Sequence, residues 1–399
     1  MNSIYFDNNA TTHLDPVVAE RMHALHCEGT SNPASQHRPG RQALRLLEEA
    51  KASILNSVGA NTSSTEAHQI ILTSGGTEAN NLAIMGLLQH RPGVCIVGAT
   101  DHPSVLEAAQ VAAAISKNAA SEARVLPVDR NGRCDLSLLE DWLREAAQKG
   151  QPISLVSMMM GNNETGVVQD LKAVCNLCRQ YDVPVHSDVV QAVGKIPVLI
   201  DDIGLSALTL TGHKIHGPVG VGALILEPTL KVTPLVVGGG QQLGIRAGTE
   251  PVVPAVGLAT ALQQILASLE AGEFERLASE RDRFEQALLD GCDAFIVAKS
   301  SERLPHTSNV SFVGLDRQAL HMALDLKGVA CSTGSACSSG SGRPSGSLVA
   351  MGLPNDIVTG SLRFSFSKFT TLEEFERGTE IIIEAVNRMK QQNLSAQSA

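Results

Sequence analysis

Lys214 directly follows His213, in a glycine-containing turn between two apolar runs at residues 207–210 and 221–226. Lysine is rarely fully buried unless another group pairs with it. Lys214 is therefore either a surface residue whose stem packs against the protein or a reactive amine. Its own stretch favours the surface interpretation, so residues elsewhere in the chain must decide between the two.

Gly75, Gly76 and Thr77 follow the apolar run 69–73 and precede a helical pattern in which Thr77 is expected to cap the helix. Free backbone N–H groups at the start of a helix bind phosphate, and the helix dipole helps. An ordinary capped turn explains the same residues equally well. The segment matches neither the dinucleotide-binding pattern nor the P-loop pattern, so a bound anion would use a different frame.

Three further polar residues follow apolar runs. Asp188 could keep a ring nitrogen protonated, but it could equally cap a helix, with Gln191 completing a capping box. His102 could stack on a flat ligand or move protons, although a lone histidine is usually structural. Asn163 stands in a segment that also suits a polar turn. Each residue alone therefore has a structural explanation.

The same residues carry more weight as a set, because all follow strand ends of one predicted sheet, where active-site groups of open α/β sheets gather. The set is Thr77, His102, Asn163, Asp188, Gln191 and Lys214. A carboxylate for a pyridine nitrogen, an amine that can form a Schiff base and a phosphate-binding helix start are what pyridoxal phosphate requires. The sequence therefore predicts a pyridoxal 5'-phosphate site.

Short apolar runs alternate with helical patterns over the first two thirds of the chain, which is typical of a mostly parallel sheet covered on both faces. The predicted strands are 69–73, 94–98, 124–128, 153–158, 183–186, 207–210 and 221–226. Beyond residue 251, long helical patterns and strands at 309–313 and 361–366 indicate a smaller α+β domain. We predict a large domain of residues 16–260 and a small domain of residues 1–15 and 261–399.

The composition restricts the class of protein. The chain has 399 residues, of which 43% are hydrophobic and 18% charged, so it can bury a large core. Its net charge of −10 argues against nucleic acid or an anionic membrane as the main partner. We find no signal-peptide pattern and no apolar run of the roughly 20 residues that a membrane span needs.

The eight cysteines lack the spacing of a disulfide framework, which fits a reducing, cytoplasmic location. Cys175 and Cys178 form a C-x-x-C pair, but it stands on a predicted helix and has no second pair. We therefore assign the pair to packing and expect no metal site.

Ten short motifs extend almost from one end of the chain to the other: residues 6–12, 32–35, 73–78, 162–169, 186–191, 211–214, 238–241, 246–249, 334–337 and 362–365. In order and spacing they resemble the motifs of the cysteine desulfurases, the NifS- and IscS-like enzymes of the class-V aminotransferase family. The resemblance implies the type I fold of pyridoxal-phosphate-dependent transferases, an α/β fold with a mostly parallel seven-stranded sheet and a smaller α+β domain.

The resemblance also implies roles around the cofactor ring. Lys214 would hold pyridoxal phosphate through its amine, and Asp188 would pair with the ring nitrogen. Gln191 and Asn163 would lie near the phenolic oxygen, and His102 would stack on the ring.

The cofactor phosphate and the substrate have their own implied residues. The phosphate would be bound by Gly76, Thr77, Thr211 and His213, with Thr249 reaching in from the second subunit of a homodimer. The substrate L-cysteine would lie near Asn32 and Asn163. Arg363 would bind its carboxylate, for which the guanidinium fork is suited.

The nucleophile is expected in the Ser- and Gly-rich segment 331–347. Composition alone cannot choose between Cys331 and Cys337, but the family pattern Gly-Ser-Ala-Cys chooses Cys337. In the implied reaction, Lys214 takes the α-proton of L-cysteine, and His102 serves the substrate thiol as acid and base. The Cys337 thiolate attacks the substrate sulfur. The products are L-alanine and a persulfide, whose sulfur passes to an acceptor protein for iron–sulfur cluster assembly or thiolation.

Other functions remain open from the sequence. A different class-V reaction is one, such as an aminotransferase or a selenocysteine lyase. A scaffold protein that kept the fold without the cofactor is another. The chain also departs from the family pattern in places: Thr100 and Asp101 stand where Glu-His is usual, and Arg343 stands where an acid is common.

Overall fold

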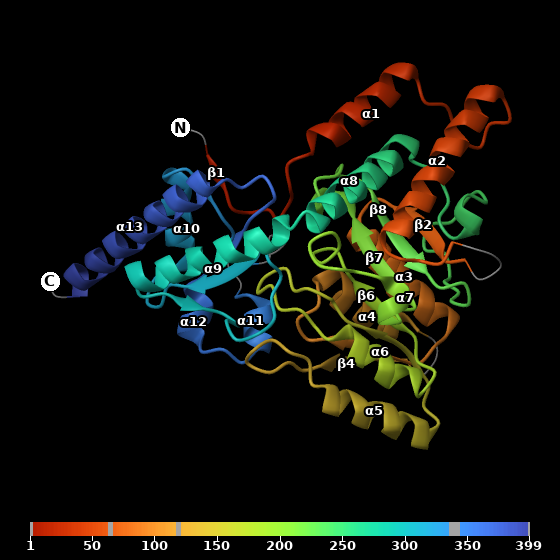
Figure 1. The fold of residues 1–399 in the computed structure, drawn as a ribbon. Coiled ribbons are helices and arrows are strands. Elements are labelled where there is room, and N and C mark those ends of the chain that lie inside the picture. The colour runs from red at the N-terminus through yellow and green to blue at the C-terminus, as the bar shows by residue number, and fades with distance from the viewer. Residues whose placement is uncertain (1–2, 63–66, 117–120, 335–343, 398–399) are drawn as a thin grey trace.

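The computed structural model describes residues 3–62, 67–116, 121–334 and 344–397 (Figure 1). Within these ranges a seven-stranded sheet forms the centre of the larger body. Its strands, in spatial order, are β2 (Gln69–Thr73), β8 (Gly222–Leu226), β7 (Ala207–Thr211), β6 (Val185–Asp188), β5 (Ile153–Ser157), β3 (Val94–Gly98) and β4 (Glu122–Leu126). Only β8 runs antiparallel to its neighbours, so the predicted mostly parallel sheet is confirmed.

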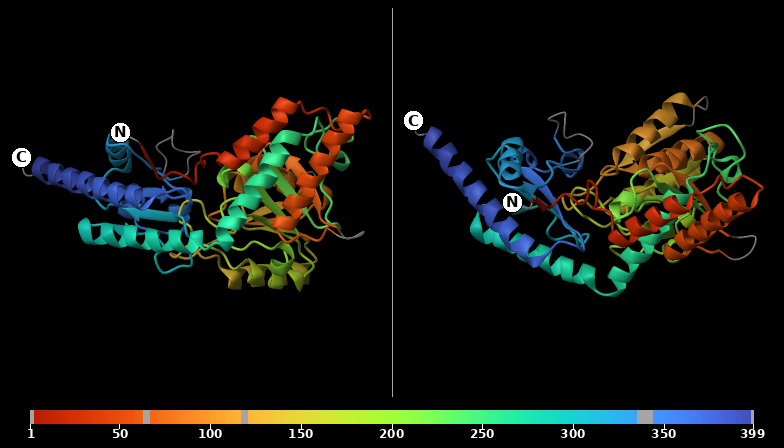
Figure 2. Two further views of the ribbon diagram at one scale, coloured as in Figure 1. Left: turned by 45° about the horizontal axis from the view of Figure 1, so that its top comes forward. Right: turned by 90° about the horizontal axis from the view of Figure 1, so that it is seen from above.

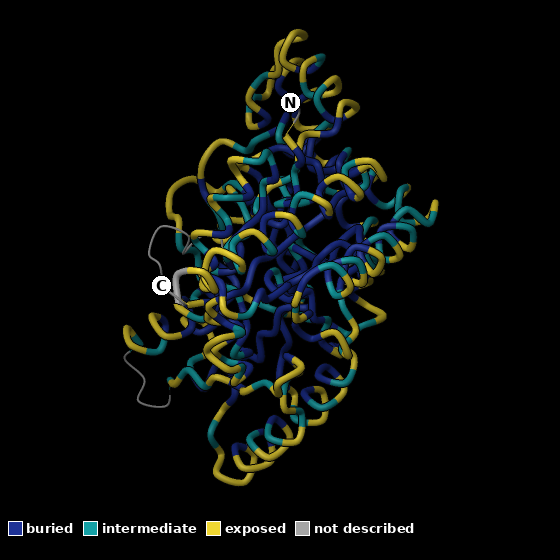
Figure 3. Tube along the Cα trace, turned by 90° about the vertical axis from the view of Figure 1, so that its left-hand side faces the viewer, coloured by how far each residue is buried: buried dark blue, intermediate teal, exposed yellow. Residues whose placement is uncertain are grey.

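Helices cover both faces of this sheet because apolar side chains alternate along the strands. Cys95 and Val97 of β3 pack with α3 (Gly76–His90) and α4 (Pro103–Ile115) on one face. Val94 and Ile96 belong to the core of the opposite face. That face carries α2 (Arg38–Ser57), α5 (Leu136–Lys149), α6 (Leu171–Arg179), α7 (Ile200–Ile203) and α8 (Val252–Glu270). Figure 3 shows the strands in the buried interior and exposed helix surfaces at the periphery.

The smaller body is built around an antiparallel sheet of β9 (Phe295–Ile296), β10 (Thr307–Ser311) and β12 (Ser361–Ser365). A cluster of phenylalanines, Phe6, Phe284, Phe364, Phe366 and Phe375, fills its core with mostly edge-to-face contacts. The surrounding helices are α9 (Glu273–Gly291), α10 (Arg317–Leu326), α11 (Gly346–Ala350), α12 (Asn355–Thr359) and α13 (Leu372–Gln397).

Two connections join the bodies, which lie side by side in both views of Figure 2. At the N-terminus, β1 (Ile4–Tyr5) pairs with β11 (Val329–Ala330), and the chain then crosses to α1 (Pro16–Glu28) on the larger body. Later, α8 and α9 are separated by a turn at Gly272, whose φ of 78° suits glycine. The predicted boundary at 260/261 falls inside α8, and the division into 16–260 and the rest stays a prediction.

In the described ranges, α8 alone is long and apolar enough to cross a membrane by length and composition. It packs against α1 and α2, and more than half of its most apolar stretch is buried inside the protein. This is the environment of a core helix, in which an apolar surface all round is expected.

Several strand boundaries differ from the sequence prediction. β4 begins and ends two residues before the predicted 124–128, and β10 precedes the predicted 309–313 in the same way. In β10, buried polar residues occupy positions that a hydrophobic pattern excludes. Their side chains are satisfied across elements, as where the Ser308 hydroxyl donates to Glu285 at 2.7 Å. Single-sequence periodicity cannot show such long-range partners.

Candidate active site

The carboxyl ends of β2, β3, β5, β6 and β7 surround a cavity of about 300 Å³. Ten of the residues predicted for the site line it: Gly76, Thr77, His102, Asn163, Asp188, Gln191, Thr211, His213, Lys214 and Arg363. Six further residues complete the lining: Asn9, Ala10, Asn80, Ser104, Met159 and Val190. The expectation that strand ends gather these side chains at one sheet edge is therefore correct.

Lys214 ends the short 3₁₀ turn η2 (Gly212–Lys214), which begins directly after β7. Its Nζ donates to the carbonyl oxygens of Asn9 at 2.5 Å and Ala10 at 2.6 Å. The N-terminal segment is itself anchored to this turn, because Thr12 N–H donates to the His213 carbonyl. The amine thus lies in a defined position inside the cavity and is not the surface lysine that its own stretch favoured.

Asp188 ends β6 and is buried. One carboxylate oxygen accepts from the Val190 backbone N–H at 3.0 Å, and the other accepts from Asn80 Nδ2 at 2.7 Å. In the described chain no helix begins at this strand end, and the Gln191 side chain donates to Asn9 instead. The helix-capping explanation of Asp188 and Gln191 is therefore wrong.

Asn80 is the partner that the sequence analysis missed. It lies on α3, and its Nδ2 donates to Ser104 Oγ at 2.9 Å as well as to Asp188. The signal was available in the sequence, because an Asn–Asn pair interrupts an otherwise apolar helical pattern.

The start of α3 faces the cavity without a side-chain cap. Gly75 is the N-cap residue, with φ 157°, and no side chain hydrogen-bonds there, so the prediction that Thr77 caps this helix is wrong. Thr77 lies inside the first turn and lines the cavity. At Gly76 an added Cβ would come within 3.2 Å of Val190, so glycine keeps this approach open. Uncapped N–H groups at the start of a helix suit an anion.

His102 is the N-cap of α4 and also lines the cavity. Its Nδ1 accepts from the Ser104 backbone N–H at 3.1 Å and lies 2.7 Å from the Ser104 hydroxyl. With Nδ1 held as an acceptor, the proton of the neutral ring is on Nε2. The structural and the functional interpretation of His102 are therefore compatible.

Asp101, one of the departures from the family pattern, stabilises the turn after β3 that precedes His102. Its carboxylate accepts from the backbone N–H groups of Met159 at 2.7 Å and Gly98 at 3.1 Å. Burial raises the pKa of Asp101 to about 7, against the opposing effect of these two donors. The residue joins the loops after β3 and β5 and so helps to position His102.

Arg363 on β12 comes from the smaller body and is buried. Its Nη2 forms an ion pair with Asp7 at 2.6 Å, and its Nη1 donates to the Asn163 carbonyl at 3.2 Å. Its Nε is buried without a hydrogen-bond partner in the described structure. Asp7 was missed because its partner is 356 residues away along the chain.

The electrostatics of the cavity are set mainly by burial and by amines. Burial, followed by the charges of Lys214 and Lys195, lowers the pKa of His213 to about 4. Its ring is therefore neutral at physiological pH, and its Nδ1 lies 3.3 Å from the Thr11 hydroxyl.

Two predicted residues in the described ranges, Asn32 and Thr249, do not line the cavity, and a third lies outside those ranges. Asn32 is exposed in the loop between α1 and α2, and Thr249 is exposed next to α8. Cys337 lies outside the described residues, as does Arg343. Thr249 was expected to act on a second subunit, so its place outside the cavity of its own chain leaves that expectation untested.

The other cysteines behave mainly as packing residues. Cys331 is buried, and its surroundings raise the pKa of its thiol well above the usual range, chiefly through burial. Cys175 and Cys178 are buried on α6, and the same effect raises both pKa values to about 12. Over the described residues, no group of His, Cys, Asp and Glu could hold a metal ion.

The cavity suits a polar, anionic ring ligand with an aldehyde. It offers an amine, a buried carboxylate, an imidazole and an uncapped helix start, which are the groups that pyridoxal phosphate needs. Among the described residues, Asn9 Oδ1, Asn80 Oδ1 and Arg363 Nε are buried without partners. Unsatisfied buried atoms around one cavity are expected where a polar ligand completes the hydrogen bonding.

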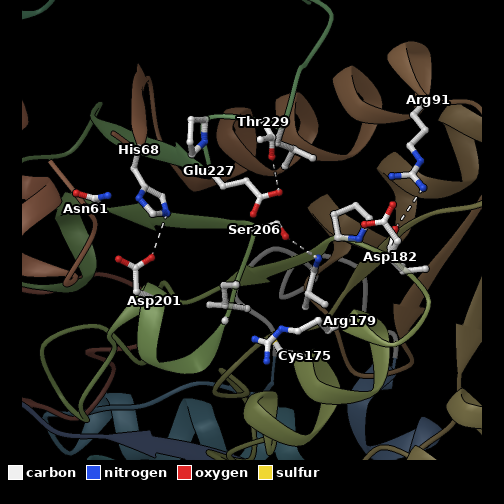
Figure 4. A pocket seen from close by; sticks show the side chains of 17 residues that line it. Asn61, His68, Arg91, Cys175, Arg179, Asp182, Asp201, Ser206, Glu227 and Thr229 are labelled. Carbon is white, nitrogen blue, oxygen red and sulfur yellow. Dashed lines mark hydrogen bonds and ion pairs between the residues drawn. The ribbon is translucent and has the colours of Figure 1, made fainter. Parts of the chain in front are cut away.

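A larger cavity of about 940 Å³ lies at the opposite edge of the sheet (Figure 4). It is formed at the starts of β6 and β7 and the end of β8, and it contains Arg91, Arg179 and Asp182 together with the His68–Asp201 pair. None of the predicted site residues that the structure describes lines it. Cavity volume alone would therefore have identified the wrong cavity as the candidate active site.

Residues 4–377 match the family described as Aminotransferase class-V. The chain is 35% identical over 391 residues to "Cysteine desulfurase IscS" of Dictyoglomus turgidum, covering 97% of this chain and 95% of the relative. It is also 35% identical over 380 residues to "Cysteine desulfurase NifS" of Azotobacter vinelandii, with 94% and 91% covered. The solved structure of a NifS-like protein from Rickettsia africae superposes with a TM-score of 0.86 at 31% identity, covering 97% of this chain and all of that one.

Proposed function

The chain belongs to the class-V aminotransferase family, and we propose that it is a pyridoxal-phosphate-dependent cysteine desulfurase that converts L-cysteine to L-alanine. One observation supports the chemistry most directly. The Lys214 amine, the Asp188 carboxylate and the His102 ring line one cavity at the carboxyl ends of the strands. Full-length similarity to cysteine desulfurases supports the choice of reaction within the family.

Pyridoxal phosphate, when bound, supplies an aldehyde that condenses with amines and a ring that withdraws electrons from the α-carbon. Lys214 is the residue that would hold it, and the uncapped start of α3 would bind its phosphate. Asp188 would keep the ring nitrogen protonated. Asn80 and the Val190 N–H fix both oxygens of that carboxylate, so it is oriented before any ligand arrives.

Two groups in the cavity can move protons. The Lys214 amine, placed by the carbonyl oxygens of Asn9 and Ala10, would take the α-proton of the substrate. His102 presents Nε2, because its Nδ1 is engaged by Ser104. Nε2 would exchange a proton with the substrate thiol.

Arg363 would bind the substrate carboxylate. Asp7 and the Asn163 carbonyl already hold two of its nitrogens and fix the plane of the guanidinium. The remaining buried Nε, which has no partner in the described structure, would donate to the incoming carboxylate. Asp7 is thus a positioning residue for Arg363.

Cys337 would receive the sulfur. Its thiolate attacks the substrate sulfur, the carbon–sulfur bond breaks, and its electron pair goes to the substrate carbon, which is then protonated. The new sulfur–sulfur bond leaves a persulfide on Cys337 that an acceptor protein takes up for iron–sulfur cluster assembly or thiolation. Cys331 is a poor alternative, because burial raises the pKa of its thiol and little thiolate is present.

We further propose a cytoplasmic homodimer. Val219, Val237 and Leu243 are large apolar residues with exposed fractions of 77%, 83% and 75%. Val237 and Leu243 belong to the segment that leads to Thr249, and the Arg246–Glu78 ion pair holds this segment against α3. Apolar exposure beside a predicted intersubunit residue is typical of an interface. The net charge of −10 supports neither nucleic acid nor an anionic membrane as partner.

The function is tested by incubating the purified protein with pyridoxal phosphate, L-cysteine and a thiol reductant, which reduces the persulfide and releases its outer sulfur as sulfide. Alanine, 3-mercaptopyruvate and sulfide are then quantified. We expect alanine and sulfide in equal amounts, and neither product from Lys214→Ala. The same assay with L-selenocysteine compares the two substrates. Transamination that yields 3-mercaptopyruvate and consumes a keto acid would instead identify an aminotransferase, and the absence of cofactor binding would favour a scaffold protein.

A further inference from the structure

Lys195 is a buried lysine that the proposed chemistry does not use. It lies in the turn after β6 and is only 5% exposed. Its Nζ donates to Gln191 Oε1 at 3.1 Å. Within the described residues, no Asp or Glu lies within ion-pair distance of it. A buried ammonium group without a carboxylate lowers the free energy of unfolding, so folding alone does not explain this residue.

The contact of Lys195 selects one orientation of the Gln191 amide. Lys195 Nζ donates to Oε1, and the Asn9 carbonyl oxygen can only accept, so Oε1 faces Lys195 and Nε2 faces the other way. On that side Nε2 donates to the Asn9 carbonyl oxygen at 3.0 Å. The reversed amide would place two donors together at Lys195 and two oxygens together at Asn9. The positions of Oε1 and Nε2 of Gln191 are therefore both fixed by hydrogen bonds.

The Nε2 side of the Gln191 amide points towards the amine of Lys214. Asn9 O accepts from Gln191 Nε2 and also from Lys214 Nζ, so the two nitrogens share one acceptor. Both side chains line the cavity. The hydrogen bond of Lys195 thus reaches the cavity through the Gln191 side chain.

The surroundings of Lys195 are cationic or neutral. Burial, followed by the charge of Lys214, lowers the pKa of Lys195 to about 7. One lysine and three histidines interact with Lys195 electrostatically: Lys214, His213, His216 and His306. Lys368, which is paired with Asp15, lines the same small cavity as Lys195. An anionic ligand oxygen on the Gln191 side would therefore meet a field that favours it.

We propose that Lys195 is a positioning residue that fixes the Gln191 amide with its N–H side towards the cofactor, and so raises the affinity of the protein for pyridoxal phosphate. The proposal rests on the proposed cofactor. Lys195 touches neither the cofactor nor the substrate in this assignment.

The test is a titration of full-length, cofactor-free protein with pyridoxal phosphate, followed by the visible absorbance of the lysine-bound cofactor. Lys195→Met removes the hydrogen bond to Gln191, so the affinity of this variant for pyridoxal phosphate should be roughly tenfold lower than that of the wild type. The absorbance band should also titrate at higher pH, because a cation near the Lys214 nitrogen is lost. Lys172→Met, the same change on the exposed face of α6, should match the wild type.

A double-mutant cycle separates positioning from general structural damage. If Lys195 acts through Gln191, Lys195→Met should have no further effect in a Gln191→Met background. Additive losses, or wild-type affinity in Lys195→Met, would overturn the proposal. If Lys195→Met does not fold, Lys195→Gln replaces it, with a several-fold loss expected and wild-type affinity as the contrary result. Failure of the wild type to bind pyridoxal phosphate would overturn the proposed function itself.

Discussion

At the scale of single residues, the candidate site depends on side chains that hold other side chains. Asn80 holds Asp188, Asp7 holds Arg363, and Lys195 holds Gln191. Asn80 and Asp7 are far in sequence from the cavity residues that they orient, and Lys195 follows Gln191 in the same turn. Their effect should therefore be seen in cofactor or substrate binding more than in folding.

Asn80→Ala tests this at the ring nitrogen. The substitution removes a charge-assisted hydrogen bond that is worth about 1.5–3 kcal/mol, so the affinity for pyridoxal phosphate should fall at least tenfold. Asn81→Ala is the matched control, because the Asn81 side chain donates to the Thr77 carbonyl on the exposed side of the same helix. Equal affinities of the two variants in the titration would show that Asp188 does not need Asn80.

His216 predicts a pH dependence of stability. Burial lowers its pKa to about 4, further lowered by Lys368 and Lys195 and opposed by the His13 carbonyl and Asp15. Because this folded value lies below the unfolded value near 6.5, the neutral ring stabilises the fold above pH 6.5. That stability is lost as the pH falls from 6.5 towards 4.

The measurement is the free energy of unfolding in denaturant at pH 7 and pH 5. The share of His216 in the loss between them should be about 2 kcal/mol, so His216→Phe should lose less stability than the wild type. His26→Phe, on the exposed face of α1, serves as control. An unchanged pH dependence in His216→Phe would refute the assignment.

At the scale of elements, strand ends place the chemistry, and buried polar contacts join the elements. Five strands end around the cavity, and β12 of the smaller body adds Arg363. In that body Arg303 forms a bidentate pair with Glu285 of α9, at 2.6 and 2.9 Å, and both side chains are less than 5% exposed. This pair anchors the segment that precedes β10.

Breaking this pair should be costly. Arg303→Met leaves a buried carboxylate without its partner and should lower the free energy of unfolding by about 3–5 kcal/mol. Arg276→Met breaks the pair of Arg276 and Glu273 on the same helix, whose side chains are 37% and 42% exposed, and should cost less than about 1 kcal/mol. Chemical denaturation of both variants checks the difference, and similar losses would contradict the assigned role of the buried pair.

The sequence predicts features that depend on neighbouring residues better than features that depend on residues far apart in the chain. Short apolar runs between helical patterns predicted the seven strands of the central sheet. The order of residues along the chain predicted that Lys214, Asp188 and His102 follow strand ends. It could not predict that Asn80 meets Asp188, which lies 108 residues away, or that Gly75 and not Thr77 is the N-cap residue. Tertiary contacts decide both.

At the scale of the whole molecule, the cavity needs both bodies and is proposed to need a second subunit. The N-terminal segment brings Asn9 and Ala10 to Lys214, and the smaller body brings Arg363. Thr249 and the exposed apolar residues Val237 and Leu243 lie on the outside of a single chain. The predicted homodimer would cover these residues.

Val237→Asp should disrupt the proposed dimer, because it places a charge in an apolar contact. We expect sedimentation to show a dimer for the wild type and a monomer for the variant, with a loss of cofactor affinity as the neighbour's Thr249 is removed. Leu326→Asp is the control, since Leu326 is 88% exposed on α10. A dimeric Val237→Asp variant would place the interface elsewhere.

The central claim is that the amine chemistry at Lys214 ends in transfer of sulfur to Cys337. Its most direct test is mass spectrometry of the protein after reaction with one equivalent of L-cysteine in the absence of an acceptor. The account predicts one added sulfur atom on the peptide that contains Cys337, together with one equivalent of alanine, and no added sulfur in Cys337→Ala. Sulfur on Cys331, or alanine formed at the wild-type rate by Cys337→Ala, would contradict it.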